Sequence, residues 1–358
     1  MKNLKVIVVG IGKQASEDHI PALLASASYE IVGLVEKDIN KHHEIKKRYG
    51  VAVHASIEEA ISTDTPDIAV LTLPHSEYRH AIELLAAKGV HIIKEKPFAV
   101  SLDEAVLYQR LMEKYGISIH VTLQRRFNPI FASAPQLIRS IGKVFAIEGK
   151  YTFNIGHLDE GWRASSHQSG GGALIDMGYH IVDLLVWYFD LPSYITASTT
   201  DGNREGQKYD VEDTVYLNFR YGEDDGNSIL GNVIVSRVFP EKQEYLHMYG
   251  TRGSVRVERG RVERFDVNGE PVESLVRDGQ WPSALVEQYE VFAHDIAHDK
   301  DSRANSRVVT LHDHLKHMAI VEASYQSAKS KSTTNVQSIY NELVRQLQER
   351  SEQYEFSN

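Results

Sequence analysis

Cysteine is entirely absent from the 358 residues of this chain. This absence excludes disulfides, cysteine-ligated zinc, iron–sulfur clusters and a thiol nucleophile, and it fits a reducing compartment. Long apolar runs are missing too, since no window approaches the ~18 to 20 apolar residues of a transmembrane helix. The chain also begins with too short an apolar run for a signal peptide. We therefore expect a cytoplasmic protein with no membrane partner.

Positive charge is also scarce. The chain carries 39 basic and 49 acidic residues, a formal net charge of −10. That balance disfavours nucleic acid and anionic membranes as partners. The residues that are present, 42% hydrophobic and 25% charged, are typical of a globular protein. This length predicts one large domain or two ordinary ones.

Strand and helix patterns alternate along the first third of the chain. Short apolar runs predict strands at residues 6–9, 31–35, 51–53, 68–73, 90–94 and 117–123. Continuous apolar strands separated by helices of roughly 10–15 residues are typical of βαβ units and a parallel sheet covered on both faces. We therefore predict a doubly wound, dinucleotide-binding Rossmann domain over residues 1–123.

The pattern changes after residue 123. Longer strands in which apolar and polar residues alternate, typical of an antiparallel sheet with one wet face, are predicted within 144–154 and 194–266. Helices are expected at 173–189, 284–298, 310–328 and 335–350. The prediction is an α/β domain at 124–332, built on a large, mainly antiparallel open sheet, followed by a helical extension at 333–358.

A glycine motif and an acidic residue indicate the cofactor. Gly10-Ile-Gly12-Lys-Gln-Ala15 matches G-x-G-x-x-[G/A] between a strand and a helix. Gly10 permits the tight turn, and Gly12 lets the backbone approach a pyrophosphate at the helix N-terminus. Glu36, at the end of the second strand, can accept hydrogen bonds from a ribose and repels a 2′-phosphate, which favours NAD over NADP. The nearby cationic groups Lys37, Lys41 and His42 could counter that charge and leave NADP possible.

Two further motifs carry candidate acid–base groups. Lys94-Glu-Lys-Pro97 follows the fifth strand, where a lysine could polarise a carbonyl or alkoxide oxygen. Asp176 and His180, four residues apart after three glycines, share one helix face, where a carboxylate can orient an imidazole. Taken singly, each has a bland alternative: a surface lysine in a turn, an exposed aspartate or a buried, satisfied histidine.

Together the three motifs resemble the glucose–fructose oxidoreductase / inositol dehydrogenase (Gfo/Idh/MocA) family. Smaller matches agree: His19-Ile-Pro-Ala-Leu23, Arg125-Arg-Phe-Asn-Pro129, Trp162-Arg163 and Asp313-His-Leu315. The resemblance implies hydride transfer between NAD(P) and a secondary alcohol or ketone of a sugar, inositol or sugar derivative. It also implies that the second domain binds this substrate and that its sheet joins homodimers or homotetramers. The chain departs from the family pattern at Tyr78, where a histidine is frequent.

The resemblance also implies residue roles. Lys96 would contact the reacting oxygen, His180 would be the general acid/base, Asp176 would bind or orient, and the Lys96–Pro97 peptide bond would be cis. The expected cofactor contacts are Gly10, Ile11, Gly12, Lys13, Gln14, Glu36, Lys37, Leu73, Pro74, His75, Glu95 and Lys96. Hydroxyl-rich substrates need polar donors and an aromatic platform. The candidates are Arg125, Arg126, Asn154, His157, Trp162, Arg163 and Tyr179, each of which could equally be structural.

Other functions are open to the same sequence. An NAD-dependent glycosidase, which oxidises, eliminates, hydrates and reduces on a retained cofactor, would share this architecture. A non-catalytic NAD-binding regulator would be expected to lose the lysine and the histidine, which are intact here. A metal site is not expected, because His314 and His317 have i,i+3 spacing but neither His312 nor Asp313 supplies an evident third ligand.

Overall fold

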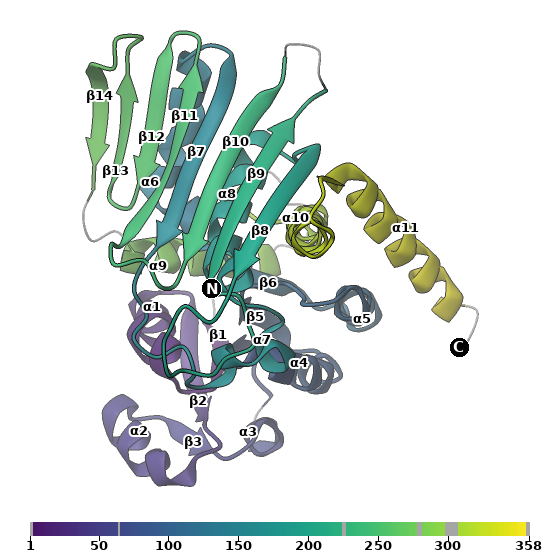
Figure 1. Cartoon of the computed structure of the whole chain (residues 1–358). Coiled ribbons are helices and arrows are strands. Elements are labelled where there is room, and N and C mark those ends of the chain that lie inside the picture. The colour runs from purple at the N-terminus through teal and green to yellow at the C-terminus, as the bar shows by residue number, and fades with distance from the viewer. Residues whose placement is uncertain (1–2, 64, 224–226, 278–280, 298–306, 356–358) are drawn as a thin grey trace. The chain divides into compact units, whose positions relative to one another are not determined.

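The computed structural model describes residues 3–63, 65–223, 227–277, 281–297 and 307–355 (Figure 1). The chain divides into two compact units. The first is Met1–Phe127 with Trp281–Val309, and the second is Asn128–Gln280 with Thr310–Asn358. Within the described residues, none of the helices combines the length and the apolar character needed to cross a bilayer.

The first unit contains, among the described residues, a six-stranded parallel sheet in the order β3-β2-β1-β4-β5-β6. The strands are β1 Leu4–Val9, β2 Tyr29–Val35, β3 Ala52–His54, β4 Ile68–Leu71, β5 His91–Glu95 and β6 Ile119–Thr122. The helices are α1 Ile20–Ala25, α2 His42–Tyr49, α3 Ile57–Thr63, α4 Tyr78–Ala86 and α5 Leu102–Tyr115. The predicted doubly wound sheet is therefore confirmed, and the strand order reverses between β1 and β4, where such sheets bind ligands.

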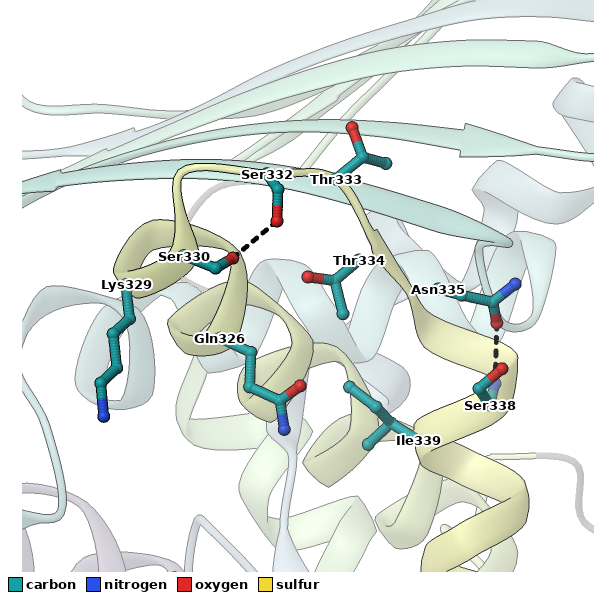
Figure 2. Close-up of a pocket in the computed structure, with 9 residues that line it drawn as sticks. All are labelled: Gln326, Lys329, Ser330, Ser332, Thr333, Thr334, Asn335, Ser338 and Ile339. Carbon is teal, nitrogen blue, oxygen red and sulfur yellow. Dashed lines mark hydrogen bonds between the residues drawn. The ribbon is translucent and has the colours of Figure 1, made fainter.

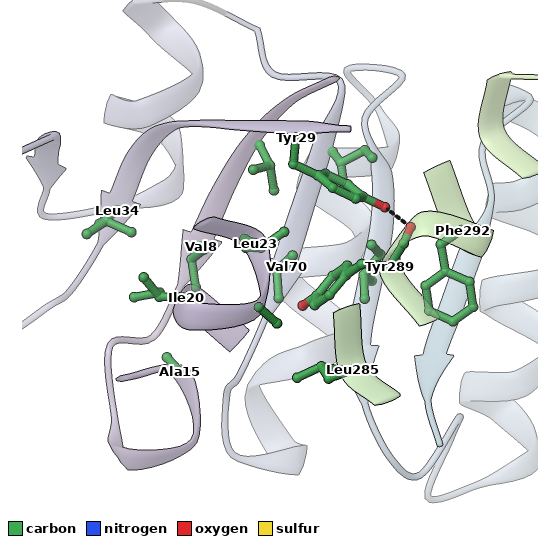
Figure 3. Close-up of a cluster of buried hydrophobic side chains, with 14 of the residues drawn as sticks. Val8, Ala15, Ile20, Leu23, Tyr29, Leu34, Val70, Leu285, Tyr289 and Phe292 are labelled. Atoms are coloured by element: carbon green, nitrogen blue, oxygen red, sulfur yellow. Dashed lines mark hydrogen bonds between the residues drawn. The ribbon is translucent and has the colours of Figure 1, made fainter. Parts of the chain in front are cut away.

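A helix from late in the chain completes the core of the first unit. Helix α9 (Trp281–Ala297) packs Leu285, Tyr289 and Phe292 into the same buried cluster as Val8 of β1 (Figure 3). The hydroxyl of Tyr29 donates to the carbonyl of Tyr289 at 2.7 Å. The helix expected at 284–298 exists, with residue 298 outside the described part. It lies, however, in the first unit. The sequence did not indicate this placement, because periodicity shows that a helix face is apolar but not which surface covers it.

The second unit is built on a sheet of nine described strands in the order β14-β13-β12-β11-β7-β10-β9-β8-β15. The strands are β7 Val144–Thr152, β8 Tyr194–Thr200, β9 Thr214–Tyr221, β10 Ile229–Ser236, β11 Gln243–Gly250, β12 Gly253–Glu258, β13 Arg261–Phe265, β14 Pro271–Val276 and β15 Thr334–Asn335. Among these, only β7 and β10 pair in parallel. The prediction of a mainly antiparallel open sheet is confirmed.

The described helices of the second unit are α6 Pro129–Ser140, α7 Ser166–Ser169, α8 Tyr179–Phe189, α10 Leu311–Ser330 and α11 Val336–Glu355. Helix α6 packs on β12 and β13, and α10 packs on β8 (Figure 1). Leu217 and Val233 are buried, whereas Tyr216 and Leu230 of the same strands are 47% and 60% exposed. This alternation is what the strand pattern predicts for a sheet with one open face.

The chain after residue 332 is integrated into the second unit. Strand β15 adds an edge to the large sheet by pairing with β8, and α11 packs against α10. The helix predicted at 335–350 is therefore present, and the segment that contains it contributes to the sheet as well as extending from it (Figure 1).

Candidate active site

The turn after β1 has two glycines with different requirements. Gly10 has a φ of +87°, and a Cβ there would lie 2.9 Å from the carbonyl oxygen of Thr72, so the fold itself requires glycine. A Cβ at Gly12 would meet no described atom within 4 Å. Packing within the described protein therefore does not explain Gly12, and the open space beside it fits the close approach of a pyrophosphate.

The helix after this turn begins irregularly. Residues Ala15–His19 form a π-helical turn, and α1 continues from Ile20 with Pro21 in its first turn. Proline has no N–H and its ring clashes with the carbonyl four residues earlier, so a regular α-helix cannot run through this position. Ser16 N–H donates to the carbonyl of Gly12 at 3.0 Å, which joins the glycine turn directly to the helix.

Glu36 connects the ends of β1 and β2. Its Oε2 accepts the N–H of Ile11 at 3.2 Å, and its Oε1 accepts the N–H of Asp38 at 3.0 Å. Each carboxylate oxygen has two acceptor positions, so the buried Glu36 can also accept ribose hydroxyls. Together with the open space at Gly12, these acceptor positions fit an adenine dinucleotide.

The remaining predicted cofactor residues of these turns lie at or near the surface. Lys37 forms an ion pair with Glu77 at 3.0 Å. Lys13 lies 4.0 Å from Glu17, and the Gln14 amide donates to Asp18 at 2.8 Å. These contacts are exposed, so they leave the side chains free to change partners at small cost.

The turn after β4 lies against the glycine turn. The Thr72 hydroxyl donates to the carbonyl of Gly10 at 2.6 Å, and the Leu73 side chain is one of the atoms that a Cβ at Gly10 would meet. His75, after the half-buried Pro74, is 4% exposed and stacks on Tyr78 with ring centroids 6.2 Å apart. The predicted residues Gly10 and Leu73 thus lie together, whereas the ring of His75 is packed inside the protein.

Glu95 at the end of β5 is held by a buried hydrogen-bond network. It accepts from the Thr122 hydroxyl at 2.7 Å and from His19 Nε2 at 2.9 Å, and His19 Nδ1 contacts the Tyr289 hydroxyl at 2.7 Å. Burial raises the pKa of Glu95, but the His19 hydrogen bond and the charges of His19 and Lys96 outweigh it, so this pKa lies below its ordinary value. Glu95 is therefore an ionised acceptor, and His19 carries a proton on Nε2.

Lys96 follows this anchored carboxylate. It is 9% exposed and lies at the carboxyl end of β5, on the sheet edge that carries the turns after β1, β2 and β4. The Lys96–Pro97 peptide bond is cis, as the resemblance implied. A nearly buried ammonium at this edge can stabilise negative charge on an oxygen more strongly than a solvated one.

Two predicted substrate residues of the first unit are packed inside it. Arg125 and Arg126 lie in the 3-10 helix Gln124–Phe127 and are 5% and 1% exposed. The Arg125 guanidinium lies over the Trp281 ring of α9, 5.4 Å from its centroid. Arg125 therefore helps to attach α9, a role that the sequence did not suggest.

In the second unit, Asp176 accepts hydrogen bonds from two arginines. It lies on the π-helical turn Leu174–Gly178 that precedes α8. Its Oδ2 accepts from Arg163 Nε at 3.2 Å and from Arg237 Nη2 at 3.1 Å, and Arg237 also donates to the carbonyl of Gly172 at 3.0 Å. Arg237 is 2% exposed and follows β10 with no motif around it, so no local sequence pattern indicated it.

Two of the three glycines before Asp176 are explained by packing of the chain on itself. A Cβ at Gly171 would lie 2.1 Å from the Tyr325 hydroxyl, and one at Gly172 would lie 1.9 Å from the carbonyl oxygen of Glu212. The Glu212 carboxylate accepts the N–H of Gly172 and of Leu174 at 2.8 and 2.9 Å. Close packing against Glu212 and Tyr325 therefore requires glycine at positions 171 and 172.

His180 and Tyr179 begin α8 but face different surroundings. His180 is partly exposed, with its ring centroid 6.3 Å from that of Tyr151. Tyr179 is 1% exposed, and its hydroxyl lies 3.3 Å from Nδ1 of the buried His317, whose Nε2 is 3.2 Å from Asp183. Tyr179 thus packs inside the second unit, whereas the sequence suggested a substrate contact. Adjacent residues on a helix point in different directions, and only packing decides which one is inside.

The other substrate candidates divide into small groups within the second unit. The Arg163 guanidinium lies over the Trp162 ring at 4.3 Å, so Trp162, Arg163 and Asp176 are neighbours. The Asn154 side chain accepts from Arg204. His157 is exposed and lies 3.5 Å from Glu160.

Two other features of the second unit lie outside these groups. Among the described residues, no group of three or more His, Cys, Asp or Glu could hold a metal ion. A polar pocket lies where α10, β15 and α11 meet (Figure 2). It is lined by Gln326, Lys329, Ser330, Ser332, Thr333, Thr334, Asn335, Ser338 and Ile339, and so, within the described part of the chain, by none of the predicted site residues.

The sheet order, the glycine turn and Glu36 define a Rossmann-type dinucleotide-binding protein with an added open-sheet unit. Residues 4–123 match the oxidoreductase family with an NAD-binding Rossmann fold, and residues 131–256 match the GFO/IDH/MocA C-terminal domain. Together these matches cover more than half of the chain. The chain belongs to the Gfo/Idh/MocA oxidoreductase family, as its motifs predicted, and its first unit contains the NAD-binding domain.

The chain is similar to several named proteins. The scyllo-inositol 2-dehydrogenase (NADP(+)) of Bacillus subtilis is 24% identical over 225 residues, which are 62% of this chain and 60% of that protein. A levoglucosan dehydrogenase in complex with NADH and levoglucosan has a TM-score of 0.79 at 20% identity, over 93% of this chain and 99% of its own. A mutant of Gal80p from Saccharomyces cerevisiae has a TM-score of 0.79 at 19% identity, over 95% and 99%. The likeness to these two structures concerns the fold.

Proposed function

We propose that this chain is a dehydrogenase that transfers a hydride between NAD and a secondary alcohol or ketone of a sugar, inositol or related polyol. The observation that carries the proposal is Lys96, a nearly buried cation on the sheet edge that also carries the Gly10–Gly12 turn and Glu36. Family membership supports oxidoreduction, and the names of an inositol dehydrogenase and a levoglucosan dehydrogenase support the substrate class.

The chain's own groups have separate tasks in this proposal. Nicotinamide, when bound, supplies the hydride acceptor or donor. The Lys96 ammonium stabilises the negative charge that develops on the substrate oxygen. His180 takes the hydroxyl proton during oxidation and returns it during reduction, because an imidazole titrates close to neutral pH. Asp176 keeps Arg163 and Arg237 in place.

The cofactor assignment follows from Glu36. Its carboxylate can accept hydrogen bonds from the two ribose hydroxyls of NAD and repels the 2′-phosphate of NADP. The exposed Lys37 pairs with Glu77 at 3.0 Å and can change partners at small cost, so the preference for NAD rests on Glu36 itself.

We further propose that two or four copies of the chain associate through the open face of the large sheet. Tyr216 and Leu230 are large exposed side chains on that face. A cytoplasmic location is supported by the lack of cysteine.

A dehydrogenase screen tests the proposal. NAD and NADP are offered separately with inositols, free sugars, sugar phosphates and nucleotide sugars, and nicotinamide absorbance is followed. Lys96→Ala and His180→Ala should each lower turnover at least about 100-fold, while fluorescence titration shows NADH binding close to that of the unchanged protein. The exposed Lys88→Ala is the matched control. Full turnover in both variants, or hydrolysis of a p-nitrophenyl glycoside with only catalytic NAD, would contradict the proposal.

A further inference from the structure

Lys94 is a buried lysine for which the proposed function has no task. It lies at the end of β5, two residues before Lys96, and is 1% exposed. Its ammonium donates to the carbonyl of Phe98 at 2.9 Å and to the carbonyl of Pro97. The hydrogen bonds of Lys94 therefore link a residue before Lys96 to the carbonyls of the two residues after it.

Aromatic rings complete the surroundings of this ammonium. Lys94 Nζ lies 4.1 Å from the centroid of the Tyr78 ring on α4 and 5.9 Å from that of Tyr108 on α5. Both tyrosines are buried, so these cation–π contacts are desolvated and are stronger than exposed ones. Tyr78 is also the position at which the chain departs from the family pattern, and the structure gives it this partner.

The charge of Lys94 is costly to bury. Burial lowers the pKa of Lys94 to about 7, against the opposing effects of Glu104 and Glu95. An apolar side chain would fill the same space without that cost. What the ammonium adds are its two hydrogen bonds to the Pro97 and Phe98 carbonyls.

We propose that Lys94 is a positioning residue that ties the segment after Lys96 to the end of β5 and so fixes the direction of the Lys96 side chain. Glu95, the neighbour of Lys96 on the other side, is already held by His19 and Thr122. Lys96 thus lies between Glu95, which is held through its carboxylate, and Pro97, which is held through its backbone carbonyl. The inference rests on the proposed role of Lys96.

Kinetics of Lys94→Met test this role, with the exposed Lys88→Met as the matched control. We expect kcat for the best polyol of the screen to fall about tenfold, while KM and NADH affinity stay near those of the unchanged protein, because a misdirected Lys96 loses transition-state contacts. An unchanged kcat in Lys94→Met would overturn the inference if Lys96→Ala is inactive. If Lys96→Ala is itself fully active, the role that the proposed function gives to Lys96 fails instead.

The pH profile separates positioning from a general structural effect. The groups that face the Lys94 ammonium are Tyr78 on α4, Tyr108 and Glu104 on α5, and Glu95 on its own strand. As the pH rises through about 7, the ammonium loses its proton and with it the charge-assisted bonds, so kcat should decline above that pH. Lys94→Met should lack this decline, and a decline that persists in Lys94→Met would contradict the assignment.

Two variants of Tyr78 add a conservative comparison. Tyr78→Phe keeps the ring and loses the hydroxyl, which contacts the carbonyl of Leu71 at 3.5 Å and the backbone of Leu73 and Glu95, so kcat should stay closer to that of the unchanged protein than in a variant without the ring. Tyr78→Leu removes the cation–π contact and should lower kcat in the same direction as Lys94→Met. Equal kcat in both Tyr78 variants would contradict the part assigned to the ring.

Discussion

At the scale of single residues, Gly10 and Gly12 show how one motif serves both folding and binding. Gly10 has a positive φ and lies against Thr72, whereas Gly12 has open space beside it. The backbone conformation therefore requires glycine at position 10, whereas position 12 requires glycine only when a pyrophosphate approaches.

This contrast predicts opposite effects of the same substitution. Gly12→Ala should weaken NADH binding at least about tenfold and leave the free energy of unfolding nearly unchanged, because the added methyl group blocks a pyrophosphate and no described atom. Gly10→Ala, the matched comparison, should lower the free energy of unfolding by at least about 1–2 kcal/mol. Fluorescence titration and denaturant unfolding measure the two effects, and equal NADH affinity of Gly12→Ala and the unchanged chain would contradict the placement of the pyrophosphate.

Glu36 sets the choice of cofactor in our proposal. Glu36→Gln should lower the ratio of kcat/KM for NAD to that for NADP about tenfold, because the amide neither repels a 2′-phosphate nor accepts as strongly from a ribose. The control is Glu30→Gln, an exposed residue of the same strand. If Glu36→Gln keeps the original ratio, the ribose lies elsewhere.

Lys94 makes stability depend on pH with a definite sign. Its pKa is lowered to about 7 in the folded chain from an ordinary value of 10.5, so between these values the unfolded chain holds the proton and the folded chain does not. The burial cost is therefore full below pH 7 and is relieved as the pH rises, by at most about 1.4 kcal/mol per pH unit. Relative to Lys94→Met, unfolding of the unchanged chain should need increasing denaturant between pH 7 and 10; a constant difference would contradict the lowered pKa.

At the scale of elements, α9 is the clearest case in which a helix was predictable and its partner was not. Its apolar positions show a buried face, but only the folded chain assigns Leu285, Tyr289 and Phe292 to the core of the first unit. Tyr289 also reaches His19, so α9 supports the network that holds Glu95.

Removing the central ring of this helix should destabilise the first unit. Phe292 is 2% exposed, so Phe292→Ala should lower the free energy of unfolding by about 3–5 kcal/mol. Leu24→Ala, an exposed position on α1, should change it by less than about 0.5 kcal/mol. Denaturant unfolding checks both, and similar losses for the two variants would show that α9 does not close this core.

Helix α8 and the turn before it show the same division. The glycines and the Asp176–His180 spacing were visible in the sequence, and both lie at the start of this helix. Arg237, which holds Asp176, lies sixty-one residues later, directly after β10, and carries no motif of its own. Its part in the site depends on a long-range contact, which local patterns do not encode.

At the scale of the whole molecule, one face of the large sheet in the second unit carries large exposed side chains. Tyr216 and Leu230 lie on β9 and β10, adjacent strands of that face. Burying such side chains between copies removes apolar area from water, which favours association.

A charge on this face should disrupt the proposed oligomer. Leu230→Glu should shift the mass measured by light scattering from that of a dimer or tetramer to that of a monomer, because an unpaired charge would be buried in the contact. Ile39→Glu, at a 70% exposed position of the first unit, is the matched control and should leave the mass unchanged. An unchanged mass in Leu230→Glu would place the contact on another surface.

The sequence by itself determined the parallel strands of the first unit, the glycine turn, Glu36, the Glu-Lys-Pro motif and the family. These features depend on residue periodicity and on turns of a few residues, so they can be read locally. Only the tertiary structure decided that α9 belongs to the first core, that Tyr179 and Arg126 are inside, that Arg237 holds Asp176, and that Lys94 supports the Lys96 segment. The physical reason is that burial and ion pairing depend on partners far apart in the sequence, and chain folding alone brings those partners together.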